Sequence, residues 1–271
     1  MPNRASVIGL LGAGNMAEAL VRALLTSNLA TPATVIAYDP REERRLLFQQ
    51  HLGVRAALSA EEVLDAADVV ILAFKPQDAE TALRPIQGRF QARHLVVSIL
   101  AGTSTRYLEA LLPTGVRVVR VMPNLLLAVG AGAAGLSPGR AACEADVAFV
   151  KQMFEASGRA LVVPEDLLDA VTALSGSGPA YFFYLIEALV EGAANLGLPP
   201  DIARELAEAT CLGAGKLLLE RGGDPAQWRQ RVTSKGGTTE AALQVLEQAH
   251  VRQAFVQAVA AAARRSRELG R

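Results

Sequence analysis

Two clusters of hydroxyl-bearing residues and glycines in the second half of the chain have the residue types that can hold a small anion. The first is Ser175-Gly176-Ser177-Gly178-Pro179-Ala180-Tyr181, and the second is Ser234-Lys235-Gly236-Gly237-Thr238-Thr239. Each stands at the start of a stretch of helical composition, where the backbone N–H groups of a first helical turn lack partners. A carboxylate needs such donors rather than a bulky cation. The two clusters therefore indicate a site for a small carboxylate substrate.

A glycine-rich turn near the N-terminus indicates a dinucleotide in the other half of the chain. It follows an apolar run and precedes a helical one, which is the context that this kind of turn requires. Gly12 permits the tight turn, Gly14 lets the backbone approach a pyrophosphate, and Ala17 in place of a third glycine still permits close helix packing. We expect NADPH or NADH to bind at Gly12, Gly14, Asn15, Met16 and Ala17.

Asp39, at the end of the second apolar run, bears on the choice between the two cofactors. It can accept hydrogen bonds from a ribose 2′-OH and repel a 2′-phosphate, which favours NADH. The arginines that follow it can hold a phosphate instead. A third possibility is that Asp39 only caps the next helix, with Pro40 at its first position. The balance narrowly predicts that NADH is used at least as well as NADPH, and Asp39 and Arg41 are assigned to the cofactor site.

The first half of the chain alternates apolar runs with helical stretches. The runs, rich in Val and Ile, are Ser6–Leu11, Thr34–Tyr38, Asp68–Phe74, His94–Leu100 and Arg117–Met122. Helices are expected at Met16–Leu25, Glu42–His51 and Glu61–Ala66, the last preceded by a capping box at Ser59 and Glu62. Continuous apolar strands joined by helices predict an α/β fold with a parallel sheet covered on both faces.

The second half has only helical signals. Helices are expected at Pro179–Asn195, Pro200–Glu220, Pro225–Arg231, Thr239–Gln248 and His250–Leu269. We therefore predict a Rossmann-type doubly wound domain over residues 1–164 and an all-helical dimerisation and substrate domain over residues 165–271. The first of these helices is apolar on nearly every side, so we expect it to be buried between two subunits.

Composition excludes several classes of partner. The 271 residues carry 27 basic and 27 acidic side chains, so nothing in the net charge favours nucleic acid or a membrane surface. No signal peptide and no membrane-spanning helix are expected. Cys143 and Cys211 are not spaced as CxxC, and are expected to be buried thiols in a reducing cytoplasm. The three histidines are scattered, so no metal site is expected.

These motifs, in this order, resemble those of the pyrroline-5-carboxylate reductases along essentially the whole chain. The matching segments are Gly12–Ala17, Ala73-Phe74-Lys75-Pro76, Arg120-Val121-Met122-Pro123-Asn124, Thr172–Tyr181 and Ser234–Thr239. The resemblance implies a Rossmann domain and an interwoven homodimer, often assembled into a decamer of five dimers. It also implies hydride transfer from NAD(P)H to the C=N bond of 1-pyrroline-5-carboxylate, which gives L-proline and completes proline biosynthesis.

On this interpretation each strand end and loop has an expected role. Ala73, Lys75, Pro76, Ala101 and Gly102 are assigned to the cofactor, with a cofactor-loop role for Lys75 favoured over a catalytic one. Substrate binding is assigned to Ser234, Gly236, Gly237, Thr238, Thr239, Asn124 and Ser177. Thr239 or Thr238 is expected to assist or orient protonation of the imine nitrogen, and either threonine is also a plausible helix cap. The glycines beside Ser177 can equally serve close approach of two subunits.

Three departures from the family pattern stand out. Leu125 and Leu126 replace the usual Thr-Pro after Asn124, Lys235 replaces a proline, and Ala60 stands where an Asn near the adenosine ribose is common. The first bears on the nicotinamide end and the last on the NADPH preference.

Other classes of protein fit less well. A serine hydrolase needs Gly-x-Ser-x-Gly, whereas Ser177 has glycines directly on both sides. A nucleotide sensor without catalysis would not need the hydroxyl–glycine loop. A related imine or hydroxy-acid reductase is the nearest alternative, but Lys216 is the only candidate for the lysine of a hydroxy-acid enzyme and has no matching motif around it.

Overall fold

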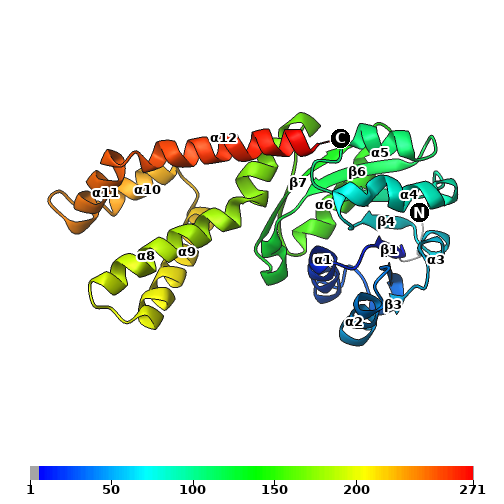
Figure 1. The fold of residues 1–271 in the computed structure, drawn as a ribbon, viewed down its shortest axis with the longest axis horizontal. Helices are drawn as coiled ribbons and strands as arrows, with labels where there is room; N and C mark the ends of the chain where they lie inside the picture. The colour runs from blue at the N-terminus through cyan, green and yellow to red at the C-terminus, as the bar shows by residue number, and fades with distance from the viewer. Residues whose placement is uncertain (1–5, 271) are drawn as a thin grey trace. The chain divides into compact units, whose positions relative to one another are not determined.

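The computed structural model describes residues 6–270, and Figure 1 shows their fold. The chain divides into two compact units, one within Met1–Ser177 and Ala262–Arg271 and the other formed by Gly178–Ala261. Residues 262–270 thus belong to the same unit as the N-terminal half. This division differs from a single cut at residue 164, because the segment after it and the end of the chain both pack with the sheet unit.

A single sheet in the order β3-β2-β1-β4-β5-β6-β7-β8 is the centre of the first unit. Neighbouring strands are parallel except β6 and β7, which are antiparallel. The strands are β1 Ile8–Leu11, β2 Val35–Tyr38, β3 Arg55–Ala56, β4 Val69–Leu72, β5 Leu95–Ser98, β6 Arg117–Met122, β7 Gly132–Pro138 and β8 Gly158–Val162. The order reverses between β1 and β4, so their carboxyl ends flank the point where ligands of open α/β sheets bind.

Helices cover both faces of this sheet, as the continuous apolar strands predict. Residues of α1, α2 and α6 pack on one face with Leu10 and Ile71, while residues of α3, α4 and α5 pack on the other with Val70 and Leu72. Their bounds are α1 Asn15–Thr26, α2 Glu42–Leu52, α3 Ala60–Ala66, α4 Ala79–Leu83, α5 Thr105–Leu111, α6 Glu144–Glu155 and α7 Leu168–Val171. The expected α/β, doubly wound fold class is confirmed.

Three strands, β3, β7 and β8, were not predicted from the sequence. β3 has only two residues, and β7 consists of Gly-Ala-Ala-Gly-Leu-Ser-Pro, which lacks the β-branched and aromatic residues typical of strands. β8 then adds to β7 in parallel. The sheet is therefore mostly parallel rather than wholly so, because β7 runs back from the end of β6.

Two local expectations were wrong in detail. Ser59 Oγ accepts from Glu62 N–H at 3.2 Å, but the Glu62 carboxylate accepts from Leu58 N–H at 2.9 Å instead of from Ser59, so the capping box is only half formed. Cys143 is exposed rather than buried, because it stands at the N-cap of α6 on the surface, and Cys211 is half-buried.

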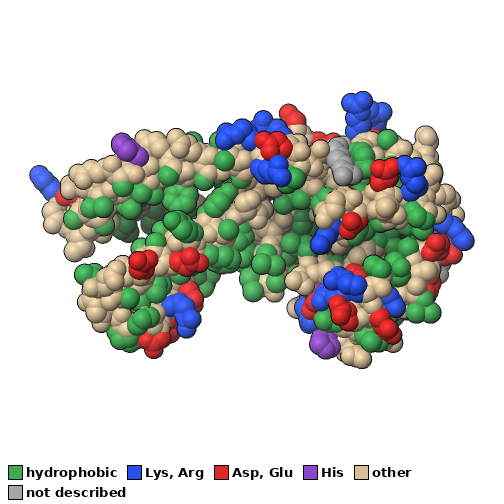
Figure 2. Space-filling view, in the orientation of Figure 1, with side chains coloured by type: hydrophobic (Ala, Val, Ile, Leu, Met, Phe, Trp, Pro, Cys, Tyr) green, Lys and Arg blue, Asp and Glu red, His purple; other side chains and the backbone are tan. Residues whose placement is uncertain are grey.

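All of the regular secondary structure in the second unit is helical. They are α8 Gly178–Asn195, α9 Pro200–Arg221, α10 Pro225–Arg231, α11 Thr238–Gln248 and α12 Val251–Leu269, whose last turns return to the first unit. α8 and α9 pack against each other, yet Phe182, Tyr184 and Leu189 of α8 are 55%, 72% and 53% exposed in the single chain. Apolar side chains accordingly reach the surface along this helix (Figure 2). Within residues 6–270, no helix combines the length and apolarity needed to cross a bilayer.

His94 is a buried, neutral histidine in the first unit. Its Nδ1 accepts from Gln91 N–H at 3.0 Å, so the proton sits on Nε2, which lies 3.0 Å from the Leu64 carbonyl oxygen. Burial lowers the pKa of His94 below its ordinary value, and the nearby charge of Arg93 adds to that effect. Asp68 acts in the opposite direction, and Arg117 adds slightly to the lowering.

We expect this histidine to make the protein less stable in acid. The unfolded chain takes up a proton at His94 as the pH falls through about 6.5, whereas the folded chain does not until the pH is lower. The free energy of unfolding should therefore fall below about pH 6.5, by at most about 1.4 kcal/mol for each pH unit. His94→Gln, which does not titrate, should show a smaller loss of Tm between about pH 7.5 and about pH 5.5. An unchanged pH dependence in that variant would contradict the assignment.

Candidate active site

A cleft of about 880 Å³ opens at the carboxyl ends of β1, β2 and β4. Its lining includes eight of the residues assigned to the cofactor from the sequence, namely Gly12, Gly14, Asn15, Met16, Asp39, Arg41, Ala73 and Lys75. Ala60 and Glu61 line the same cleft. Ala17 is fully buried and serves helix packing instead. The cleft has the size and the position of a dinucleotide site.

Two glycines shape the turn at the floor of this cleft in different ways. Gly12 has φ +102°, and a Cβ there would lie 2.6 Å from the carbonyl carbon of Ala73, so the neighbouring strand end leaves no room for a side chain. Gly14 is the N-cap of α1 in an extended conformation, and a Cβ there would meet nothing within 4 Å among the described residues. Gly12 is therefore required by the fold, whereas Gly14 leaves open space for a ligand at the positive end of α1.

Asp39 is joined to the glycine turn as well as to its neighbour Arg41. Its Oδ2 accepts from Ala13 N–H at 2.9 Å, and its Oδ1 accepts from the backbone N–H and the Nε of Arg41, each at 3.0 Å. Burial by itself would raise the pKa of the Asp39 carboxyl, but the hydrogen bonds from Arg41 and Ala13 outweigh it and the pKa is lowered. Asp39 is thus a buried, ionised carboxylate at the wall of the cleft.

The capping role considered for Asp39 was wrong, because α2 begins at Glu42 and its N-cap is Arg41.

Two further arginines donate hydrogen bonds to backbone carbonyl groups, one in the glycine turn and one at Asp39. Arg44 Nε donates to the Ala13 carbonyl at 2.6 Å, and Arg45 Nη1 donates to the Asp39 carbonyl at 2.7 Å. Of the three arginines, only Arg41 lines the cleft, with a side chain that is 58% exposed.

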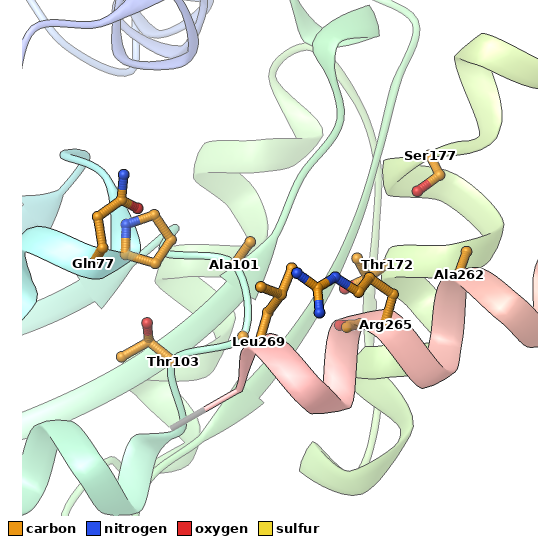
Figure 3. Close-up of a pocket in the computed structure, with 11 residues that line it drawn as sticks. Gln77, Ala101, Thr103, Thr172, Ser177, Ala262, Arg265 and Leu269 are labelled. Atoms are coloured by element: carbon orange, nitrogen blue, oxygen red, sulfur yellow. The ribbon is translucent and has the colours of Figure 1, made fainter.

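A second pocket, of about 480 Å³, lies beside the ends of β4 and β5 in the same unit. Figure 3 shows how its residues converge from the two strand-end loops, from the single-turn π-helix Thr172–Gly176 and from the last turns of α12. Three residues assigned to the cofactor, Pro76, Ala101 and Gly102, line it together with Ser177. The remaining lining residues are Gln77, Thr103, Thr172, Ala262, Arg265, Ser266 and Leu269. Single-turn π-helices are rare and are frequent at functional sites.

Sequence reasoning missed Thr172 and Arg265. Thr172 stands three residues before Ser175, in the segment that carries the resemblance, and its helical spacing could have drawn attention to it. Arg265 lies in an Ala-rich helix far along the chain, and nothing in the sequence signals that this helix returns to the sheet unit.

Asn124 follows the end of β6, as expected, and its side chain makes two hydrogen bonds. Its Nδ2 donates to the Ser175 carbonyl at 3.1 Å, and its Oδ1 accepts from Ala133 N–H at 3.1 Å. The side chain is buried and lines neither of the two pockets described above. Asn124 thus joins the end of β6 to the segment that carries Ser175 and Ser177.

Glu165 joins the loop after β5 to the neighbouring strand. Its carboxylate accepts from the backbone N–H and the hydroxyl of Thr105 at 2.6 Å and 2.5 Å, and from Arg120 Nη1 at 3.3 Å. Thr105 begins α5, one residue beyond the pocket residues 101–103. No sequence motif pointed to this network, which holds the Ala101–Thr103 loop against β6.

The loop that precedes α11 lies in the second unit. Gly237 N–H donates to the Ser234 carbonyl at 3.0 Å, and Gly236 N–H donates to Glu240 Oε2 at 2.7 Å. Both glycine N–H groups are therefore engaged, that of Gly237 within the loop and that of Gly236 by a side chain of α11, although both glycines were assigned to substrate binding. Thr238 and Thr239 begin the helix, where N–H groups have no intrahelical acceptor. The backbone N–H groups of Thr238 and Thr239 are therefore available to a ligand.

Comparisons with known proteins match the chain from end to end. Residues 165–269 match the model for pyrroline-5-carboxylate reductase dimerisation, and residues 7–102 match the model for NADP oxidoreductase coenzyme F420-dependent proteins. A pyrroline-5-carboxylate reductase of Methanosarcina acetivorans is 40% identical over 264 residues, which is 97% of this chain and 98% of that protein. One from Arabidopsis thaliana is 39% identical over 270 residues, 99% of this chain and 97% of that protein.

Solved structures of pyrroline carboxylate reductases are also similar to this chain over nearly its whole length. A pyrroline-5-carboxylate reductase from Coxiella burnetii has a TM-score of 0.92 and 35% identity, covering 99% of this chain and 100% of that one. The Plasmodium falciparum pyrroline carboxylate reductase with NADP bound has a TM-score of 0.88 and 26% identity, covering 98% of each chain. The high identity over nearly the full length, together with the glycine turn and the hydroxyl–glycine segments, shows that this chain belongs to the pyrroline-5-carboxylate reductase family.

Proposed function

We propose that this chain reduces 1-pyrroline-5-carboxylate to L-proline with hydride from NAD(P)H, the last step of proline biosynthesis. The observation that carries the proposal is that the dinucleotide cleft and the hydroxyl-lined pocket share the loop after β4, which lines the cleft with Ala73 and Lys75 and the pocket with Pro76 and Gln77. Hydride donor and acceptor would meet where these two spaces adjoin. The relatives from Methanosarcina acetivorans and Arabidopsis thaliana, which match over nearly their whole length, are named pyrroline-5-carboxylate reductases. Separate assays with NADH and NADPH test the proposal.

The residues of the cleft fit a dinucleotide. Gly14 and the first turn of α1 offer space and N–H groups for a pyrophosphate, and Ala73 and Lys75 border the path toward the second pocket. The bound nicotinamide supplies the hydride, while the chain aligns donor and acceptor and holds charge. Ala101 and Gly102, held in place through Thr105 and Glu165, form the pocket wall where the ring would lie.

We assign recognition of the substrate's polar groups to the loop before α11 and to Ser177. The N–H groups of Thr238 and Thr239 and the Ser234 hydroxyl are neutral donors for the carboxylate. The Thr239 hydroxyl, on a half-buried residue, is the candidate that orients or assists protonation of the imine nitrogen. Gly236 and Gly237 shape the loop, and Gly236 does so with φ +72°.

Cofactor choice is expected to depend on Asp39 and Arg41. A carboxylate about 4 Å from a 2′-phosphate repels it by on the order of 1 to 4 kcal/mol, and Arg41 reduces that repulsion. We expect NADH to be used at least as well as NADPH. Asp39→Ser should shift the ratio of kcat/KM values toward NADPH by about tenfold or more, since about 1.4 kcal/mol is tenfold.

Because Asp39 also holds Ala13 N–H, Asp39→Ser should weaken both cofactors to some extent, so the ratio is the quantity to measure. Arg41→Ala is the matched variant and should shift the ratio toward NADH. A wild-type enzyme that strongly prefers NADPH, with a ratio unaffected by Asp39→Ser, would instead identify the arginines as the 2′-phosphate site.

A homodimer is the expected assembly, with decamers of five dimers as a further level and residues 165–271 as the dimerisation and substrate domain. The apolar surface of α8 supports a dimer, since a single chain leaves much of it exposed. Light scattering should give about twice the 28.5 kDa of one chain for a dimer, or about ten times that mass if five dimers assemble. A monodisperse monomer at micromolar concentration would contradict this expectation.

Charge on α8 should break the dimer. A double variant with Phe182→Glu and Leu189→Glu would place two carboxylates in an apolar interface, which costs several kcal/mol. We expect it to be monomeric. Leu58→Glu, at an 81% exposed leucine of the first unit, is the control and should leave the dimer intact.

We place the reaction in the cytoplasm. Cys143 and Cys211 are both free thiols, which is typical of proteins in a reducing compartment.

A further inference from the structure

One end of the dinucleotide cleft is formed by the segments that follow two neighbouring strands of the first unit. β2 and β3 pair in parallel with Ala37 opposite Ala56, and Ala57 N–H donates to the Ala37 carbonyl at 2.8 Å. Their carboxyl ends therefore lie side by side, and the segments beyond them bring Asp39 and Glu61 to the same cleft. The residue after the second strand of a doubly wound sheet meets the adenosine ribose of a bound dinucleotide. Glu61 thus lines the cleft near the group in which NADH and NADPH differ.

The carboxylate of Glu61 is not neutralised by the chain. Glu61 is half-buried, and within residues 6–270 its side chain makes no hydrogen bond and no ion pair. The next residue, Glu62, differs in both respects, since its carboxylate accepts from Leu58 N–H at 2.9 Å and lies 3.5 Å from Arg55. Glu62 also does not line the cleft. Of these two adjacent carboxylates, only that of Glu61 acts on a ligand there.

The arginines at this end of the cleft already have partners. Arg41 donates from Nε to Asp39 Oδ1 at 3.0 Å and from Nη2 to Asp39 Oδ2 at 3.3 Å, so its charge is paired with that carboxylate. Arg44 Nη2 donates to Glu18 Oε2 at 3.1 Å, and Arg45 Nη1 donates to the Asp39 carbonyl at 2.7 Å. A 2′-phosphate would have to compete with these partners for a guanidinium.

The charges that line the whole cleft are acidic in sum. They are the three carboxylates of Asp39, Glu61 and Asp78 and the two cations Arg41 and Lys75. A phosphate monoester adds about 1.5 to 2 further negative charges near neutral pH, whereas a ribose 2′-hydroxyl is neutral and can donate a hydrogen bond to a carboxylate. The cleft is therefore better matched to a ribose that carries a free 2′-hydroxyl.

We propose that Glu61 is a specificity-determining residue that repels the 2′-phosphate and makes NADH the preferred cofactor. This inference rests on the proposed use of NAD(P)H and adds to it a second carboxylate beside Asp39. The charge of Asp39 is compensated by Arg41, but that of Glu61 is not. Glu61 accordingly contributes to the discrimination even where Asp39 and Arg41 neutralise each other.

Binding of NADH and NADPH to the full chain, measured by calorimetry without substrate, tests the proposal. Glu61→Gln should lower the Kd for NADPH by about threefold to tenfold and leave that for NADH within about twofold, because only the phosphate is repelled. Glu61→Lys, which reverses the charge, should lower the Kd for NADPH further. Added salt should narrow the difference between the two Kd values more in the wild type than in Glu61→Gln, since it screens the repulsion.

Glu62→Gln is the matched control, because it removes the same charge one residue along and outside the cleft lining. Its ratio of the two Kd values should equal that of the wild type. An unchanged ratio in Glu61→Gln, an equal change in Glu62→Gln, or tighter wild-type binding of NADPH than of NADH would overturn the proposal. If Glu61→Gln does not fold, the ratio in Glu61→Lys decides in the same way. A chain that shows the expected Kd values but does not reduce 1-pyrroline-5-carboxylate would refute the proposed reaction and support this role of Glu61.

Discussion

Gly12→Ala is expected to abolish cofactor binding and to lower Tm by several degrees, whereas Gly14→Ala should impair cofactor binding alone. At Gly12 the added Cβ would sit 2.6 Å from the Ala73 backbone, at a φ of +102° that an L-residue rarely adopts. Strain of this kind costs on the order of 1–3 kcal/mol before any clash is relieved, which is several degrees in Tm for a domain of this size.

Gly14→Ala separates cofactor binding from folding. Nothing among the described residues lies within 4 Å of its added Cβ, so Tm should be unchanged. The methyl group would occupy the space through which a pyrophosphate approaches the turn, so the Kd for NAD(P)H should rise by at least about tenfold. Gly88→Ala, also without contacts but outside the cleft lining, is the control for both measurements. Unaltered binding in Gly14→Ala would remove the pyrophosphate from this turn.

Thr239→Ala is expected to lower kcat/KM for 1-pyrroline-5-carboxylate by about 10- to 1,000-fold, the range for a lost donor or an oriented acid. The protein should remain folded and dimeric, because the backbone bonds from Gly236 and Gly237 that shape the loop do not involve the Thr239 side chain. Thr239→Ser, which keeps the hydroxyl, should recover most of the activity.

Thr238→Ala is the neighbouring comparison, on an exposed residue at the first position of α11. We expect a smaller effect there. If Thr239→Ala has wild-type kinetics and Thr238→Ala does not, the role belongs to Thr238. If neither changes, the backbone N–H groups alone serve the substrate.

The sheet and most helices could be predicted because their signals are local. The apolar runs rich in Val and Ile mark β1, β2, β4, β5 and β6, and α10 was predicted at the bounds that it has in the structure. β7 could not be predicted, since its small residues form a strand only because β6 offers an edge to pair with. Here tertiary pairing overrides local propensity.

Part of the site could also be predicted, because some of its residues are close together in sequence. The glycine turn is contiguous in sequence, so its residues could be named, and Gly12, Gly14, Asn15 and Met16 line one cleft. Asn124 was identified by its position after a strand, but whether its amide faces a ligand or Ser175 depends on the packing of distant segments. Arg265 reaches its pocket only because α12 returns across the unit boundary, which periodicity within one helix does not encode.

The central claim is tested most directly by mixing the purified chain with 1-pyrroline-5-carboxylate and either NADH or NADPH. Loss of the reduced nicotinamide absorbance is followed while L-proline is quantified in the same reaction. We predict saturable oxidation of the cofactor with one L-proline formed for each reduced nicotinamide consumed. No oxidation with either cofactor, or oxidation without L-proline, would contradict the assignment of this chain as a pyrroline-5-carboxylate reductase.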